Sequence, residues 1–269
     1  MFNIVHVDSL ADPRIADFRD LKDRELSRAG GKFIAEGEWV VRRLLASSYE
    51  TDSVLLAERI ADELAPLVPP TVPVYVAPAE LVSRIVGFRF HSGAIAAGRR
   101  KAPLALTDLL PRLGSTATLI VLPEITSTEN LGGLLRIAAG FGADGVLLGE
   151  RCCDPFYRQS VRVSMGTVFR LAIVQSTDLD ADLRRLGHAD FERIATVLDD
   201  NATPLATTTR RPRIALLMGN EAQGLSPHHT ALCDHNVTIP MRLGTDSLNV
   251  TVAAGIFLHH YCDVAVKTP

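Results

Sequence analysis

Apolar residues along the chain follow two patterns that alternate from one end to the other. Short unbroken apolar runs, such as 53–57, are typical of strands, whereas stretches such as 38–48, with apolar side chains every three or four positions, are typical of helices. This alternation predicts an α/β fold. In the first part of the chain the pattern predicts strands at 32–37, 53–57, 73–77 and 93–98, and helices at 18–28, 38–48, 78–86 and up to Leu64.

The predicted strands in the second part of the chain are apolar at nearly every position rather than at every second one. This is typical of a parallel sheet that helices cover on both faces. Ligands of such sheets bind beyond the carboxyl ends of the strands. The pattern predicts strands at 118–122, 145–149, 168–174, 193–198, 214–219 and 236–241, and helices at 130–142, 154–166, 178–187 and 245–260.

A stretch rich in basic residues, prolines and turn formers separates the two parts. A chain of 269 residues suits two modest domains better than one. We therefore predict a first α/β domain over residues 1–101, a linker over 102–116 with room for a short helix, and a second domain over 117–269.

Composition excludes several classes of protein. Hydrophobic residues make up 47% of the chain, which argues against disorder, and the formal net charge of -3 gives no overall attraction to a polyanion. Positive and negative side chains also balance within 1–101, so any RNA binding must depend on local patches. The last helix contains His259 and His260 and is too short for a membrane span, and no signal peptide is recognisable.

The four cysteines have no zinc-like spacing, and no histidine is accompanied by carboxylates or cysteines that would complete a metal site. Cys152 and Cys153 are adjacent and are most simply reduced thiols, which favours a cytoplasmic protein without a structural metal.

Two loops that follow strands in the second domain carry unusual polar residues. In the first, Asn130 stands where a helix begins and its amide can cap free N–H groups, while Arg136 lies within an otherwise apolar helix. In the second, Gly219 ends a buried strand and Asn220 and Glu221 follow it. Taken alone, Arg136 can be a snorkelling or ion-paired residue, and Glu221 can be a surface residue of a plain turn.

A third loop precedes the last helix. Asp246 or Ser247 is predicted to cap that helix, and simple capping would account for Ser247. Asn249 is then expected in the first turn of an apolar helix, where its amide needs a partner.

These loops resemble a known set of signatures. The patterns N-x-G-x-x-x-R from Asn130, G-N-E-x-x-G-L-S from Gly219, and I-P-M followed by S-L-N-V-x-V-A look, in this order, like the three motifs of the SpoU family of RNA 2'-O-ribose methyltransferases, a branch of the SPOUT superfamily. The similarity covers roughly 119–264. The segments "FIAEGEWVVRRLL" and "RFHSGAIAAGRRK" resemble the L30e-like RNA-binding domain that precedes many such catalytic domains.

The resemblance implies a parallel α/β sheet with a C-terminal trefoil knot, a homodimer formed through the methyltransferase domain, and S-adenosylmethionine as cofactor. It implies cofactor contacts at Thr196, Gly219, Asn220, Ile239, Met241 and Leu248. It implies that Arg136 fixes the reacting hydroxyl, with Asn130, Glu221, Ser247 and Asn249 in supporting roles and with some of these residues supplied by a partner chain. Backbone groups suit the adenine edge, and an apolar slot suits its faces.

RNA is the expected partner, ribosomal RNA in preference to transfer RNA, because of the additional N-terminal domain. Each basic candidate for RNA contact can equally be solvated surface; the candidates are Arg24, Arg28, Lys32, Arg89, His91, Arg99, Arg100 and Lys101. Two other classes stay open: a non-catalytic RNA-binding or ribosome-assembly factor on the same fold, and a base methyltransferase of the same superfamily.

Overall fold

The computed structural model describes residues 3–21, 31–220, 222–243 and 247–262. It divides into two compact units. The first comprises the residues up to Ala102 together with Pro155–Arg170, and the second comprises Pro103–Asp154 and the residues from Leu171 onward. The contacts therefore group 155–170 with the first unit, although this segment lies within the predicted second domain. Along the described chain, no helix is both long enough and apolar enough to cross a membrane.

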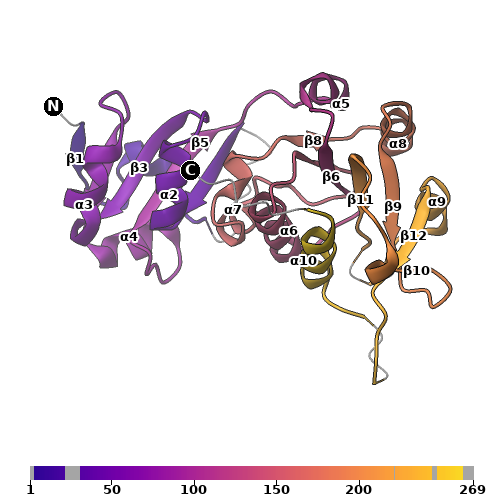
Figure 1. The fold of residues 1–269 in the computed structure, drawn as a ribbon. Helices are drawn as coiled ribbons and strands as arrows, with labels where there is room; N and C mark the ends of the chain where they lie inside the picture. The colour runs from indigo at the N-terminus through magenta and orange to yellow at the C-terminus, as the bar shows by residue number, and fades with distance from the viewer. Residues whose placement is uncertain (1–2, 22–30, 221, 244–246, 263–269) are drawn as a thin grey trace. The chain divides into compact units, whose positions relative to one another are not determined.

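The first unit is built on a five-stranded mixed sheet in the order β1-β4-β3-β5-β2 (Figure 1). Strand β5 runs antiparallel to β2 and β3, and the other pairs are parallel. The strands are β1 (Ile4–His6), β2 (Lys32–Glu36), β3 (Thr51–Ala57), β4 (Val74–Ala77) and β5 (Ala94–Arg99). The α-helices are α2 (Glu38–Leu45), α3 (Glu58–Leu64), α4 (Ala79–Val86) and α7 (Arg158–Val163). Short 3-10 helices lie at Pro13–Phe18, Ala65–Leu67 and Thr167–Phe169.

The four predicted strands of this unit are confirmed. The predicted helix at 18–28 falls mostly outside the described residues. Strand β1 escaped prediction because it is only three residues long and His6 follows Ile4 and Val5, so it contains no extended apolar run. The L30e-like character of the unit stays a prediction.

An aromatic cluster explains why 155–170 belongs to the first unit. The rings of Phe156 and Phe169 lie 5.3 and 5.2 Å from the ring of Phe33, and both also pack on Tyr49. Gly98 permits this packing, because a Cβ atom there would lie 2.4 Å from the Phe33 ring. Arranged aromatic pairs of this kind stabilise a core beyond simple burial.

The second unit contains a seven-stranded sheet in the order β10-β12-β9-β11-β6-β7-β8, and all of its pairs are parallel. The strands are β6 (Ala117–Leu122), β7 (Gly145–Leu148), β8 (Ile173–Gln175), β9 (Glu192–Thr196), β10 (Thr203–Pro204), β11 (Arg213–Leu217) and β12 (His235–Thr238). The predicted parallel sheet is confirmed. The strand predicted at 168–174 is shorter than expected, because 167–169 form a 3-10 helix.

The helices of this unit are α5 (Leu106–Leu109), α6 (Thr128–Gly140), α8 (Leu179–His188), α9 (Pro227–Ala231) and α10 (Val250–Tyr261), with 3-10 helices at Leu110–Arg112 and Leu205–Thr207. Helices α5 and α8 share one hydrophobic cluster with β6, β8 and β11. Helices α6 and α10 pack together on the opposite side of the sheet (Figure 1). The segment between β12 and α10 includes 244–246, which lie outside the described residues, so the trefoil knot stays a prediction.

Candidate active site

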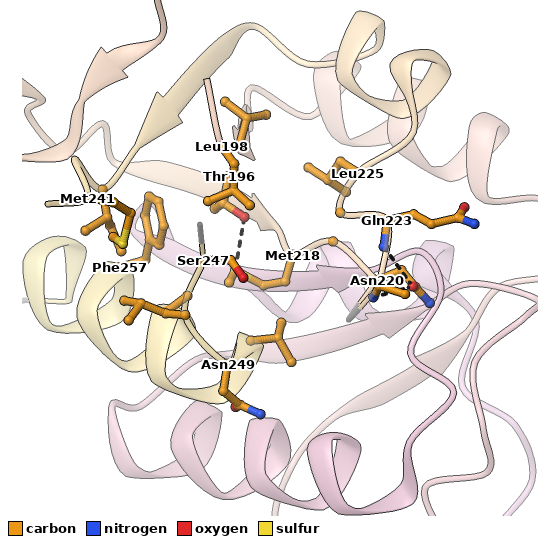
Figure 2. Close-up of a pocket in the computed structure, with 18 residues that line it drawn as sticks. Thr196, Leu198, Met218, Asn220, Gln223, Leu225, Met241, Ser247, Asn249 and Phe257 are labelled. Carbon is orange, nitrogen blue, oxygen red and sulfur yellow. Dashed lines mark hydrogen bonds between the residues drawn. The ribbon is translucent and has the colours of Figure 1, made fainter. Parts of the chain in front are cut away.

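A cavity of about 490 Å³ lies beyond the carboxyl ends of β9, β11 and β12 (Figure 2). Three segments that are distant in sequence line it: the residues after β9, the turn after β11, and the residues around the start of α10. The volume falls in the usual range of small-molecule sites, ~300–1,000 Å³. Every residue that the motifs assign to the cofactor lines this cavity: Thr196, Gly219, Asn220, Ile239, Met241 and Leu248. Ser247 and Asn249 line it as well.

The turn after β11 is held by a closed set of hydrogen bonds. The backbone N–H groups of Asn220 and Gly224 each donate to the carbonyl of the other, both at 2.9 Å. The Oδ1 atom of Asn220 accepts from Ala222 N at 2.9 Å, and its Nδ2 donates to the carbonyl of Glu124 at 3.3 Å. Both polar atoms of the Asn220 side chain are therefore used in hydrogen bonds that hold the turn.

Gly219 allows this turn to close against the strand end. A Cβ atom at Gly219 would lie 2.4 Å from the carbonyl carbon of Gly224, which is closer than any side chain can approach. Gly224 itself has φ +67, in the left-handed region that favours glycine. The turn thus presents backbone to the cavity, as the prediction of cofactor contacts through backbone groups requires.

The opposite side of the cavity is apolar. Figure 2 shows Met241 and Phe257 together on the side away from Asn220 and Gln223. The Thr196 hydroxyl donates to the carbonyl of Leu217 at 2.8 Å, so it is committed to the strand ends. The described part of the lining contains no ionisable side chain. A flat apolar ligand with a polar edge fits such a site, because shape and backbone groups can recognise it.

Asn249 caps α10, contrary to the prediction that Asp246 or Ser247 would do so. Helix α10 begins at Val250, and Oδ1 of Asn249 accepts from the N–H of Thr251 at 2.8 Å. Asn249 therefore precedes the helix rather than lying in its first turn; Asp246 lies outside the described residues. The Nδ2 atom of Asn249 donates to Oδ1 of Asn130 at 3.0 Å. Asn130 is therefore the partner that the Asn249 amide was expected to need.

Asn130 does not cap α6, as the sequence had suggested. Ser127 is the cap, and its Oγ accepts from the N–H of Asn130 at 3.3 Å. The Asn130 side chain can therefore accept from Asn249. Gly133 lies one turn further along α6, where a Cβ atom would be 2.4 Å from Cγ2 of Thr251. Glycine at this position allows α6 and α10 to pack closely enough for the two motifs to meet.

Arg136 is exposed on α6 and is not part of the cavity lining. It forms no hydrogen bond or ion pair with the residues that the structure describes. Glu221, its predicted partner, lies outside those residues. A single chain thus brings Asn130, Ser247 and Asn249 to the cavity or its edge, but not Arg136.

The candidates for RNA contact differ in their surroundings. Arg24 and Arg28 lie outside the described residues. Lys32 pairs with Asp17 at 2.5 Å and with Asp52 at 2.6 Å, and the hydrogen bond that it donates to Asp17 is the main cause of its raised pKa. Arg99 also pairs with Asp52 at 2.6 Å. These carboxylates neutralise both cations and make them poorer phosphate ligands.

Two of the remaining candidates lie over aromatic rings. The guanidinium of Arg100 lies 5.2 Å from the centroid of the Phe156 ring, and Lys101 lies over Tyr49. Arg89 and His91 line a second cavity, which belongs to the first unit.

Sequence reasoning missed Phe257 and Gln223 as lining residues. The helical period could have identified Phe257, because Val250, Ala253 and Phe257 follow one another at three and four positions along α10 and line the same cavity. Within the described residues, no cluster of three or more His, Cys, Asp or Glu side chains is placed to hold a metal ion.

Comparison with known proteins identifies a family and several relatives of this chain. The family model of the SpoU rRNA Methylase family matches residues 117–259. An uncharacterised tRNA/rRNA methyltransferase of Mycobacterium tuberculosis is 37% identical over 91% of this chain and 87% of its own length. The 23S rRNA (guanosine-2'-O-)-methyltransferase of Acinetobacter baylyi is 31% identical over 71% of this chain and 78% of its own.

A solved structure is also similar over nearly the whole chain. The AdoMet-bound rRNA methyltransferase of Sinorhizobium meliloti has a TM-score of 0.79 and 25% sequence identity, covering 96% of this chain and 97% of that one. The matched residues 117–259 span the three motifs and the cavity that the second and third motifs line. The chain therefore belongs to the SpoU rRNA methylase family.

Proposed function

We propose that this protein transfers a methyl group from S-adenosylmethionine to a ribose 2'-hydroxyl of structured RNA, and that the RNA is ribosomal. The observation that carries the proposal is the convergence of the second and third motifs on one cavity, together with the bond between Asn249 and Asn130 that joins them to the first motif. The Acinetobacter relative, named as a 23S rRNA guanosine 2'-O-methyltransferase, supports the ribose specificity and the choice of RNA.

The cavity residues suit S-adenosylmethionine, which the similar Sinorhizobium structure contains. Ile239, Met241 and Leu248 supply an apolar slot for the adenine faces, and the backbone of the Gly219 turn supplies donors and acceptors for its edge. Bound in this way, the cofactor supplies an electrophilic methyl group on a sulfonium centre.

The protein's part in the reaction is alignment and electrostatic stabilisation. The ribose oxygen must lose its proton as it bonds to the methyl carbon, so a fixed cation beside that oxygen favours transfer. Arg136 fills this role without acting as a base, because a guanidinium keeps its proton in proteins. The proton passes to water or to a phosphate oxygen. Ser247 and the Asn249–Asn130 pair orient the hydroxyl.

A second copy of the chain brings Arg136 to the site. Arg136 is exposed on α6, and on the neighbouring α10 the side chains of Val252 and Ile256 are 51% and 39% exposed. Exposed apolar side chains on one face of a helix are typical of a surface that another subunit covers. We therefore propose a homodimer through the α6 and α10 face of the methyltransferase unit, with Arg136 acting on the partner's cavity.

The direct test is methyl transfer to rRNA isolated from a strain that lacks the gene. The purified protein and isotope-labelled S-adenosylmethionine should place label on a ribose 2'-oxygen, identified by nuclease digestion and mass spectrometry of the nucleosides. Label on a base, or label on transfer RNA alone, would contradict the ribose or the ribosomal part of the proposal. Bound cofactor with no label on either RNA would favour a non-catalytic RNA-binding factor.

A further inference from the structure

The first unit contains its own cavity, of about 630 Å³, which the methyl-transfer chemistry does not use. The start of α2, the turn after α4, and α7 surround it. All of these elements belong to the same compact unit. The cavity therefore has the size of a ligand site, and no ligand is yet assigned to it.

The wall of this cavity carries aromatic surface that is open to solvent. Trp39, the single tryptophan of the chain, is 62% exposed. Phe88 is half-buried, and the guanidinium of Arg158 lies 4.6 Å from its ring centroid. Exposed indole rings and stacked guanidinium groups are the platforms on which proteins stack unpaired RNA bases.

The charges around the cavity leave an excess of cations. Glu36 is 8% exposed and pairs with Arg158, and Glu38 pairs with Arg42 at 3.1 Å. The carboxylates are thus compensated. Arg89 and Arg162 line the cavity, are exposed, and form no ion pair with any described residue. Two free guanidinium groups beside an aromatic platform match the chemistry of a nucleotide, which combines an apolar face with a phosphate.

We propose that this cavity binds one unpaired nucleotide of the RNA substrate, with its base stacked on Trp39 and its flanking phosphates paired with Arg89 and Arg162. The inference rests on the proposed function for its RNA. It gives the unit a local means of binding RNA, although residues 1–101 carry as many acidic as basic side chains, because one stacked base and two phosphate contacts are local. An acidic peptide would satisfy the arginines but would leave the indole face unused.

Trp39 supplies a direct test, since the emission of the full-length protein reports on this one residue. Titration with pentaadenylate RNA should quench the emission saturably, whereas an abasic ribose-phosphate chain of the same length should not. Arg89→Gln combined with Arg162→Gln should weaken binding roughly tenfold, because two phosphate contacts are lost. Arg84→Gln, an exposed arginine of α4 outside the cavity, is the matched control and should bind as the wild type does.

Trp39→Ala should weaken binding of fluorescently labelled pentaadenylate about tenfold, within the usual contribution of one stacked base, and Trp39→Phe should retain most of the affinity. In methyl transfer, Trp39→Ala should raise KM for RNA and leave kcat unchanged. Equal quenching by the abasic chain, equal quenching by pentaglutamate, or full affinity in the double arginine variant would each overturn the inference.

The two proposals fail separately. If methyl transfer to the ribose is intact and the base-dependent quench is absent, only the nucleotide site is wrong. If the quench and its dependence on Arg89 and Arg162 are present but no 2'-O-methyl product forms on rRNA, the proposed reaction is wrong and the nucleotide site stands.

Discussion

The Nδ2 group of Asn249 donates to Oδ1 of Asn130 at 3.0 Å, and this bond joins residues that are 119 positions apart in the chain. The same Asn249 side chain accepts from Thr251 N through its other atom, at 2.8 Å. One amide therefore fixes the start of α10 and ties it to the first turn of α6. This dual role requires an asparagine, because the side chain must accept on one side and donate on the other.

Asn249→Asp separates the two roles. The carboxylate can still accept from Thr251 N at the helix start, so we expect the free energy of unfolding to stay within about 1 kcal/mol of the wild type. The carboxylate has no N–H for Asn130, and a misplaced group at a reacting centre can lower the rate about 100-fold. Urea unfolding and kcat on rRNA measure the two effects.

Asn249→Ala is the companion variant. It removes the cap as well as the bond to Asn130, so it should lose about 1 kcal/mol of stability in addition to activity. If Asn249→Asp keeps the wild-type kcat, the bond to Asn130 has no part in the reaction.

Gly133 and Gly140 on α6 give a matched pair for the packing of the two helices. A Cβ atom at Gly133 would lie 2.4 Å from the Cγ2 atom of Thr251, a β-branched residue with a stiff side chain. We expect Gly133→Ala to cost about 1–3 kcal/mol of unfolding free energy, as overpacking of a core does. Nothing lies within 4 Å of the corresponding atom at Gly140, so Gly140→Ala should be neutral or stabilising by up to about 1 kcal/mol.

Urea unfolding of both variants measures the difference, and a cofactor titration of Gly133→Ala should also show weaker binding, since α10 carries part of the cavity wall. Equal free energies of unfolding for the two variants would mean that α6 and α10 can move apart at little cost. The close packing at Gly133 would then contribute nothing to stability.

The parallel sheet of the second unit could be predicted because its strands are unbroken apolar runs, which are typical of strands that helices cover on both faces. The cavity could be predicted because Gly219, Ile239 and Leu248 follow strand ends, and parallel strands bring those ends to one edge. The caps could not. Ser127 and Asn130 are both good capping residues, as are Asp246, Ser247 and Asn249, and backbone geometry alone decides among them.

The packing of 155–170 on the first unit could not be predicted from the sequence either. Phe156 lies in a predicted helix and Phe169 in a predicted strand of the second domain, where both look like ordinary apolar positions. Their packing on Phe33 and Tyr49 depends on tertiary contacts. The exposure of Trp39 could not be predicted either, because it lies on a helix whose neighbours Val40 and Val41 are buried.

Burial raises the pKa of the Cys233 thiol to about 12, although Arg193 opposes the shift. The thiolate is the reactive form, so at pH 8 we expect Cys233 to react with iodoacetamide about 1,000-fold more slowly than a free thiol with a pKa near 9. Mass spectrometry of the alkylated native protein measures this, with protein unfolded in urea as the control. Rapid native labelling of Cys233 would contradict its burial.

The same shift has a consequence for stability. The folded state favours the protonated Cys233 thiol. The contribution of this thiol to the free energy of unfolding is therefore present below a pH of about 9, and it is lost as the pH rises toward about 12.

Arg136→Ala should abolish methyl transfer and leave cofactor affinity within a few fold, because Arg136 is outside the cavity lining of its own chain. Loss of both would contradict its role. Its supply by a partner can be tested by co-expressing the Arg136→Ala chain with the Asn249→Ala chain, each of them inactive alone. If the site combines Asn249 of one chain with the arginine of the other, a mixed dimer has one complete site.

Statistical pairing makes half of the dimers mixed, so the co-expressed sample should recover about a quarter of the wild-type activity. If each chain supplies its own Arg136, no complete site forms in any pairing and the activity stays at the level of the single variants. Co-expression of Arg136→Ala with Arg136→Lys controls for expression effects, since neither chain offers a guanidinium and no recovery is expected. Recovery in the first pair and not in the second requires two chains to build one site, as the proposed homodimer does.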